Sequence, residues 1–277
     1  MTDLNLISEP TEEELSQVAR DLNFEKTRND NPQSLSLLQI NQYNELGYLM
    51  PLRGLPADEI NEVRIFFDQV LKETLAAGNS SYSISTAHLK FGNIYDLMSH
   101  PAIIEPVKDL LGEDLVAWGA HFFCKMPNDG KRVPWHQDCP YWPLTPTRTA
   151  TVWLAIDDAD VENSCMRFIA GSHRHGHIDY RQSDKAENNL FNQTALDAEH
   201  YGECVDVEMR AGEISIHSDL LLHSSEANHS DRRRCGLTLR YCAMDVRALS
   251  GFGWAEEGVV IRGKDASGHW GNPPRPS

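Results

Sequence analysis

The spacing of apolar positions changes near residue 115. Before this point, apolar residues recur every three or four positions in several segments, which is the period of a helix with one buried face. After it, short runs rich in aromatic and β-branched residues are separated by turn residues, which predicts strands. A mostly β domain flanked by helices is therefore expected. The expected helices are residues 11–22, 37–46, 56–77 and 101–111, and the expected strands are 48–51, 116–126, 149–156, 203–209, 213–218, 220–225 and 235–244.

Composition divides the chain into three parts. Residues 1–36 form an N-terminal arm with a short peripheral helix and a polar linker, residues 37–262 form one domain, and the Gly- and Pro-rich residues 263–277 form an extended tail. All-β domains of this size commonly fold as one unit. Two polar segments interrupt the domain. Residues 79–92 suit an active-site lid, and residues 183–202 suit either a surface loop or a lid.

The stretch Pro134-Trp135-His136-Gln137-Asp138 places an imidazole and a carboxylate two residues apart. Side chains alternate faces along a strand, so His136 and Asp138 would point the same way at a strand end. Such a pair is two-thirds of the facial triad of two histidines and one carboxylate that holds iron(II). Because the chain has 12 histidines and 41 acidic residues, a structural salt bridge is the alternative interpretation. The turn residues Asn128-Asp129-Gly130 would join this stretch to the preceding strand in a hairpin.

A second stretch supplies another histidine and an anion-binding group. If residues 221–225 form a strand, His223 and Ser225 share a face, and Arg234 opens the next strand eleven residues after His223. Arginine is permanently charged and can bind a carboxylate with two hydrogen bonds. Polar and apolar residues alternate along that next strand, which predicts one polar face toward a cavity and one apolar face toward the core. The polar positions are Arg234, Gly236, Thr238 and Arg240, and the apolar ones are Cys235, Leu237, Leu239 and Tyr241.

The charge and the cysteine content exclude several classes of protein. A formal net charge of −16 favours a soluble protein and argues against broad binding to nucleic acids or anionic membranes. The first ten residues lack the basic start and apolar run of a signal peptide, and no apolar stretch reaches 18 residues. The six cysteines form no CxxC pair, so reduced thiols in a cytoplasmic protein are expected. These features carry no information about the oligomeric state.

Three motifs taken together resemble the phytanoyl-CoA dioxygenase family of iron(II)/2-oxoglutarate oxygenases. They are His136-Gln137-Asp138, the segment Gly171-Ser172-His173-Arg174-His175-Gly176, and His223-Ser224-Ser225 followed by Asn228 and Arg234. The likeness extends over about residues 37–244. Ala170 and Ser164 depart from the family, which usually has proline and glycine at these places. His173 and His175 are interpreted as surface or supporting groups and not as metal ligands.

The resemblance implies a double-stranded β-helix, or jelly roll. It implies His136, Asp138 and His223 as ligands of iron(II), with Arg234 and Ser225 holding the distal carboxylate of 2-oxoglutarate. Weaker candidates for that pocket are Gln137, Lys125 and Trp153. The cofactors would be iron(II), 2-oxoglutarate and molecular oxygen, with ascorbate as an aid to activity. The implied reaction converts 2-oxoglutarate to succinate and carbon dioxide while a substrate C–H bond is hydroxylated, and the presence of Asp138 disfavours halogenation.

Candidate substrate-binding residues adjoin the expected ligands. Tyr141 and Trp142 could cover an apolar or cationic part of a small-molecule substrate, or could simply pack at the mouth of the barrel. Four further residues could meet charged groups of the substrate, or could form internal salt bridges or a solvated rim: Arg240, Arg167, His217 and Asp219. The family acts on acyl-CoA thioesters, amino acids, phosphonates and secondary metabolites. The candidate cavity arginines favour a small polar metabolite, and the most specific hypothesis is an organophosphonate such as 2-aminoethylphosphonate, hydroxylated at the carbon next to phosphorus.

Two other functions stay open at this point. A cupin-like iron enzyme that does not use 2-oxoglutarate would keep its activity without Arg234. A non-catalytic binding module on a jelly roll is the second alternative, because a fold alone does not establish an activity. Failure of the protein to bind iron would favour this second alternative.

Overall fold

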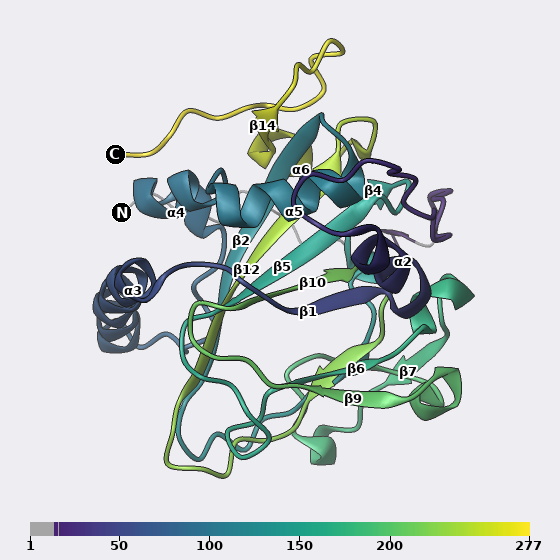
Figure 1. Cartoon of the computed structure of the whole chain (residues 1–277). Coiled ribbons are helices and arrows are strands. Elements are labelled where there is room, and N and C mark those ends of the chain that lie inside the picture. The colour runs from purple at the N-terminus through teal and green to yellow at the C-terminus, as the bar shows by residue number, and fades with distance from the viewer. Residues whose placement is uncertain (1–13, 16) are drawn as a thin grey trace.

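A computed structural model describes residues 14–15 and 17–277. Its centre is a pair of antiparallel sheets, the arrangement of a jelly roll (Figure 1). The large sheet has the order β1 (Tyr48–Leu52), β10 (Ile214–Ser218), β5 (Thr149–Ala155), β12 (Arg234–Ala243), β2 (Leu115–Lys125) and β14 (Val259–Arg262). The small sheet has the order β3 (Val133–His136), β11 (His223–Ser225), β6 (Met166–Ile169) and β9 (Cys204–Val207). The expected mostly β fold is confirmed.

The remaining elements lie around this centre. In Figure 1, α5 (Pro101–Leu111) crosses the large sheet, and its Ile103 and Val107 join Val152 and Leu239 of that sheet in the main hydrophobic core. Two short strand pairs, β4 (Leu144–Thr145) with β13 (Arg247–Ala248) and β7 (Tyr180–Gln182) with β8 (Gln193–Ala195), complete the β-structure. The other helices are α2 (Leu37–Leu46), α3 (Ala57–Ala76), α4 (Gly92–Leu97) and α6 (Trp254–Glu257).

Local signals in the sequence set the limits of α2. The Ser36 side chain accepts a hydrogen bond from the backbone N–H of Gln39, and the Gln39 side chain accepts one from the backbone N–H of Ser36. Gly47 then ends the helix in the left-handed region at φ 85°, a conformation that glycine adopts without strain. The helix expected over residues 37–46 is confirmed. The helix expected over residues 101–111 is also confirmed, and the helix expected from Pro56 begins at Ala57.

Three expectations about elements need correction. The strands on either side of Asn128-Asp129-Gly130 do not form a hairpin, because β2 pairs with β12 and β14 whereas β3 pairs with β11 in the other sheet. The strand expected over residues 220–225 begins only at His223. For the helix expected over residues 11–22, positions 11–13 and 16 lie outside the described residues, Glu14 and Leu15 are helical, and from Ala19 onward the chain has no regular secondary structure until Leu37.

The alternation along β12 separates two environments. Leu237 and Leu239 face the main hydrophobic core, whereas Arg234, Thr238 and Arg240 line a cavity between the sheets. The same division holds in the neighbouring strand β5, where Val152 joins the core while Thr151 and Trp153 line the cavity. The predicted polar cavity face is confirmed, and it places the candidate site inside the jelly roll.

Gly236 offers a test of this packing, because a methyl group at that position would overlap the Trp153 ring. We expect Gly236→Ala to lower the free energy of unfolding by about 1–3 kcal/mol, the usual cost of overpacking a core. Chemical denaturation monitored by tryptophan fluorescence measures the change. Gly130→Ala is the control, because its methyl group would contact only the Asn188 side chain, 3.4 Å away. Equal stability of the two variants would contradict the expectation.

Candidate metal centre and substrate cavity

Two histidines and an aspartate gather where the small sheet ends. His136 closes β3 and His223 opens β11, and the two residues are paired across these strands with their ring centroids 4.0 Å apart. Asp138 lies beyond the end of β3 with helical dihedral angles, and its backbone N–H donates to the carbonyl of Asp219 at 2.9 Å. One potential ligand atom from each of the three buried residues lies within 4.8 Å of the others. A turn, and not the alternation of a strand, therefore brings Asp138 to the same side as His136.

Hydrogen bonds fix the tautomers of both histidines. His136 Nδ1 lies 2.8 Å from the carbonyl oxygen of Pro134, and His223 Nδ1 lies 2.9 Å from that of Leu221. A carbonyl only accepts, so each Nδ1 carries the proton and each Nε2 keeps its lone pair for a metal. Burial lowers the pKa of both imidazoles, which favours the neutral form that binds metals.

The third ligand is held in its charged form. Burial alone would raise the pKa of Asp138, but its interactions with His217, His223 and Arg240 outweigh burial and lower the pKa well below the ordinary range. Two neutral imidazole nitrogens and one carboxylate oxygen on one side of a site form the donor set of the facial triad. The residues present therefore fit iron(II).

A pocket between the two sheets extends from these ligands to Arg234, and we call it the inner pocket. Arg234 is 3% exposed; it donates from Nη2 to Ser225 Oγ at 3.1 Å and from Nε to the carbonyl of Ser164 at 3.0 Å. Its guanidinium carbon lies 5.7 Å from the Trp153 ring centroid. The lining residues are Phe123, Val133, His136, Asp138, Thr151, Trp153, Met166, Phe191, His217, His223, Ser224, Ser225, Arg234, Thr238 and Arg240.

The charge of Arg234 is not neutralised within the described part of the chain. Burial lowers its pKa, the largest opposing effect comes from Tyr82, and the ion pairs of 4.0 Å or less among the described residues do not include Arg234. Arginine stays protonated even so, and a buried cation without a counter-ion is costly. An anion in the inner pocket would remove this cost, so the arrangement fits the distal carboxylate of 2-oxoglutarate.

Ser164 stands where the family usually has glycine, and it contacts both Lys125 and Arg234. Its φ of 71° lies in the left-handed region, where glycine is the unstrained choice. The serine nevertheless accepts a hydrogen bond from Lys125 Nζ at 3.1 Å with its Oγ, while its carbonyl accepts from Arg234. Lys125 itself also donates to the carbonyls of Ser225 and Glu226 and does not line the inner pocket. Lys125 thus lies behind the candidate anion site.

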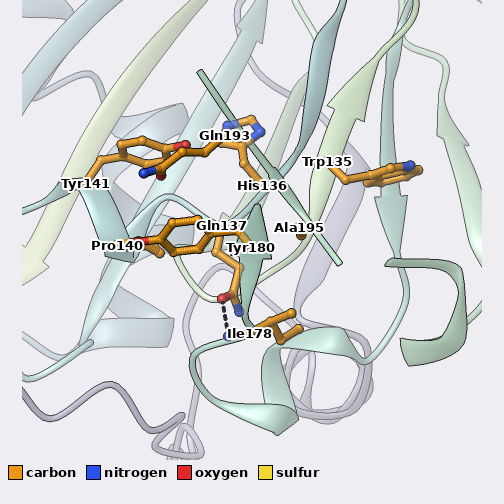
Figure 2. Close-up of a pocket in the computed structure, with 9 residues that line it drawn as sticks. All are labelled: Trp135, His136, Gln137, Pro140, Tyr141, Ile178, Tyr180, Gln193 and Ala195. Atoms are coloured by element: carbon orange, nitrogen blue, oxygen red, sulfur yellow. Dashed lines mark hydrogen bonds between the residues drawn. The ribbon is translucent and has the colours of Figure 1, made fainter. Parts of the chain in front are cut away.

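Two of the other expected residues lie outside the inner pocket. Gln137 donates to the carbonyls of Gly176 and Leu220 and accepts from the N–H of Ile178; Figure 2 shows its side chain directed at Ile178 while the His136 ring points the opposite way. Asp219 is 2% exposed and lines neither this pocket nor the larger cavity beside it. Its carbonyl instead holds the turn that carries Asp138.

A larger cavity of about 550 Å³ adjoins the inner pocket, and we call it the outer cavity. Phe123, His136, Asp138, Phe191 and Arg240 line both spaces, so the candidate metal site opens into each of them. The outer cavity therefore has access to the position of a reaction at the metal. Its lining residues are Leu15, His121, Phe123, His136, Asp138, Pro140, Tyr141, Trp142, Tyr180, Gln182, Leu190, Phe191, Asn192, Gln193, Arg240 and Trp254.

Arg240 lies beside a pair of tryptophans, Trp118 and Trp142, whose ring centroids are 4.5 Å apart. Its guanidinium carbon is 5.2 Å from the ring centroid of Trp142 and 5.6 Å from that of Trp118. A register shift in the pairing of β12 with β2 lets Arg240 pair with Gly119 and Tyr241 with Ala117, so Trp118 is the extra residue of a bulge. The bulge brings Trp118 against Arg240. Both expected residues Tyr141 and Trp142 also line the cavity.

The segment of residues 183–202 supplies part of the cavity wall. Leu190 donates its N–H to the carbonyl of Arg132 at 2.7 Å, and the adjacent Phe191 ring lies 4.8 Å from the His136 ring. The sequence predicted either a surface loop or a lid here and did not single out Phe191. The apolar pair Leu190-Phe191 inside a polar stretch was the available signal. Residues 79–92, the other expected lid, line neither space.

The N-terminal arm also reaches the outer cavity. Leu15 lines it, and Arg20 Nη1 donates to the carbonyls of Cys139 and Trp142, each at 2.8 Å. The arm continues along the next residues, where Thr147 donates its N–H to the carbonyl of Asp21 at 3.1 Å. The sequence predicted a peripheral helix here, because nothing in a single sequence pairs Arg20 with carbonyls about 120 residues away. This part of the arm is not peripheral.

A model of the family described as phytanoyl-CoA dioxygenase (PhyH) matches residues 43–236. The chain belongs to this family. A probable phytanoyl-CoA dioxygenase from Caenorhabditis elegans is 25% identical over 241 residues, which are 76% of this chain and 77% of the relative. A probable alpha-ketoglutarate-dependent hypophosphite dioxygenase from Stutzerimonas stutzeri is 28% identical and covers 61% of this chain and 60% of its own length.

Solved structures agree with this assignment. The apo form of the non-heme monooxygenase ThoJ is 26% identical with a TM-score of 0.70, covering 85% of this chain and 87% of its own. The alpha-ketoglutarate-dependent carbocyclase SnoK is 25% identical with a TM-score of 0.66, and the match covers 80% of this chain and 90% of SnoK. The family and these structures make the chain an iron(II)/2-oxoglutarate-dependent dioxygenase with a jelly-roll fold. None of the described helices is long and apolar enough to cross a membrane.

Replacing Arg234 tests the inner pocket. We expect Arg234→Ala to weaken 2-oxoglutarate binding by at least about 100-fold, because it removes a charged hydrogen-bond donor for the carboxylate. Anaerobic titration of the iron-loaded protein, followed by the visible band of the chelated keto acid, measures the affinity. Arg232→Ala is the matched control, because Arg232 forms ion pairs with Asp160 and Glu162 at the surface. An unchanged affinity in Arg234→Ala would remove Arg234 from the site.

Replacing Arg20 tests the attachment of the arm. We expect Arg20→Ala to speed exchange of the Thr147 amide hydrogen at least about 10-fold, since two hydrogen bonds from a charged donor are lost. Hydrogen–deuterium exchange of peptides that cover residue 147 measures this rate. Lys26→Ala is the control, because Lys26 forms an exposed ion pair with Glu45. Equal exchange in both variants would show that Arg20 does not hold the arm.

Proposed function

We propose that this dioxygenase hydroxylates a small anionic metabolite in the outer cavity, and that the most specific candidate is an organophosphonate such as 2-aminoethylphosphonate, oxidised at the carbon next to phosphorus. The observation that carries the proposal is the position of Arg240. Its side chain lies in the outer cavity, which it shares with the candidate metal ligands His136 and Asp138.

In this proposal, the inner pocket holds the cofactors. His136 and His223 bind iron(II) through Nε2, and Asp138 binds it through a carboxylate oxygen. Arg234 and Ser225 bind the distal carboxylate of 2-oxoglutarate, with Trp153 packed against the guanidinium. When bound, iron and 2-oxoglutarate supply the oxidising power for hydroxylation of a C–H bond, with succinate and carbon dioxide as the other products.

Arg240 would orient the substrate. The adjoining rings of Trp118 and Trp142 lie within cation–π distance of the guanidinium and restrict it. A planar guanidinium that is restricted in this way can bind two oxygens of a phosphonate or carboxylate with little further loss of entropy. The rest of the substrate would then extend toward His136 and Asp138, where its C–H bond is positioned for the reaction.

One relative supports a phosphorus oxyanion over other anions. The Stutzerimonas stutzeri protein is described as acting on hypophosphite, a small anion of that class. Hydroxylases of acyl-CoA, of amino acids and of secondary metabolites remain the alternatives, and an iron enzyme that does not use 2-oxoglutarate is a further one. The buried cation Arg234, whose hydrogen bonds within the described residues go to a carbonyl and a hydroxyl, favours an enzyme that uses 2-oxoglutarate over the last alternative.

The test compares substrate classes and an arginine variant. Small phosphonates, amino acids, acyl-CoA thioesters and polyketide-like secondary metabolites are each incubated with iron(II), 2-oxoglutarate and oxygen, and substrate-dependent succinate is measured. We expect phosphonates to give the highest kcat/KM. In Arg240→Ala, kcat/KM should fall about 10- to 100-fold while 2-oxoglutarate binding is kept, because a hydrogen bond to a charged group is lost.

Arg262→Ala is the control for that variant, because Arg262 lies at the edge of the large sheet and pairs with Glu105. Unchanged kinetics in Arg240→Ala would remove Arg240 from the substrate site. Preference for an acyl-CoA or a neutral metabolite would overturn the proposed substrate class while leaving the dioxygenase assignment intact.

A further inference from the structure

The two carboxylate oxygens of Asp138 face different partners. Oδ1 lies 4.0 Å from His136 Nε2 and 3.9 Å from His223 Nε2, so it belongs to the three-atom metal set. Oδ2 instead lies 3.3 Å from Thr151 Oγ1 and 3.8 Å from His217 Nε2. The protein itself therefore orients the carboxylate.

His217 is the unexplained member of this arrangement. It lies on β10, paired with Thr151 of β5, and is 1% exposed. Neither of its ring nitrogens has a hydrogen-bond partner among the residues that the structure describes. A buried imidazole without a hydrogen bond is costly, so its position in the wall of the inner pocket calls for a functional reason.

Neighbouring rings hold His217 in place. The Phe168 ring centroid lies 5.2 Å away and the His223 ring centroid lies 4.9 Å away. The His217 side chain is not in the group of potential metal ligands, which contains His136, Asp138 and His223. The charged atom nearest its Nε2 is Oδ2 of Asp138, whereas Oδ1 is the oxygen nearest the two ligand histidines.

We propose that His217 is a positioning residue that, together with Thr151, binds Oδ2 of Asp138 and leaves only Oδ1 for the metal. Thr151 is already within hydrogen-bond distance, and a shift of less than about 1 Å brings His217 Nε2 to a distance of about 3 Å. Groups that hydrogen-bond to metal ligands in this way orient the ligands and raise the affinity for the metal.

The consequence concerns the number of metal positions that stay open. A carboxylate that binds through one oxygen occupies one position, whereas a chelating carboxylate occupies two. With two histidines and a single oxygen from Asp138, an octahedral ion keeps three positions for other ligands. His217 and Thr151 would thus preserve the third open position, because an Oδ2 that donors hold in place is not available to the metal.

The test uses metal binding and needs no substrate. Anaerobic titration with iron(II) gives the affinity, and the visible spectrum of the cobalt(II)-loaded protein reports the coordination number. We expect His217→Ala to bind iron(II) about 10- to 100-fold more weakly and to change the cobalt spectrum. His217→Gln, which keeps an N–H donor at a similar reach, should restore the affinity to within about 3-fold.

A second pair of variants keeps the proposal testable if His217→Ala does not fold. Thr151→Val removes the hydroxyl at constant shape and should weaken metal binding, whereas Thr151→Ser keeps the hydroxyl and should not. Wild-type affinity and spectrum in both His217→Ala and Thr151→Val would overturn the proposal. Equal loss in His217→Ala and His217→Gln would also overturn it, because a packing role alone would not distinguish the two. Failure of the proposed substrate class would leave these results unaffected.

Discussion

The buried positive charge of Arg234 is the constraint on which the interior of this jelly roll depends. A guanidinium that is enclosed by two sheets needs acceptors for its N–H groups, and the chain supplies the carbonyl of Ser164 and the hydroxyl of Ser225. The Trp153 ring packs against the guanidinium, and only a glycine at position 236 leaves room for that ring. A bound anion such as the distal carboxylate of 2-oxoglutarate would supply the negative charge. The chain thus provides hydrogen-bond acceptors for Arg234, and the cosubstrate would provide its counter-ion.

The metal ligands and Arg234 could be predicted because their signals are local. His136 and His223 stand at strand ends, and the alternation from Arg234 to Arg240 indicates by itself which side chains face the cavity. The resemblance to a family indicated that the histidines and Arg234 belong to one site. Local periodicity and the family motifs were thus enough to predict the metal ligands and Arg234.

Other parts of the site could not be predicted, because a period of two residues assigns faces only while the strand lasts. β3 ends at His136, so the period does not place the next residues: the Gln137 side chain is directed to the loop of residues 176–178, and Asp138 reaches the metal set through a turn. Asp219 follows the end of β10, and its backbone has a role where its side chain was expected to have one. Trp118 reaches Arg240 through a bulge, which is an irregularity of pairing between two strands and so is not visible in either strand alone.

Part of the outer cavity wall comes from segments outside the residues that match the family model. The metal ligands and Arg234 lie within residues 43–236, the part that matches the family model, whereas Leu15, Arg20, Arg240 and Trp254 lie outside it. The wall of the cavity thus includes segments that the common family pattern does not constrain. A substitution at Leu15 or Trp254 would therefore alter the wall of the outer cavity while leaving His136, Asp138, His223 and Arg234 in place.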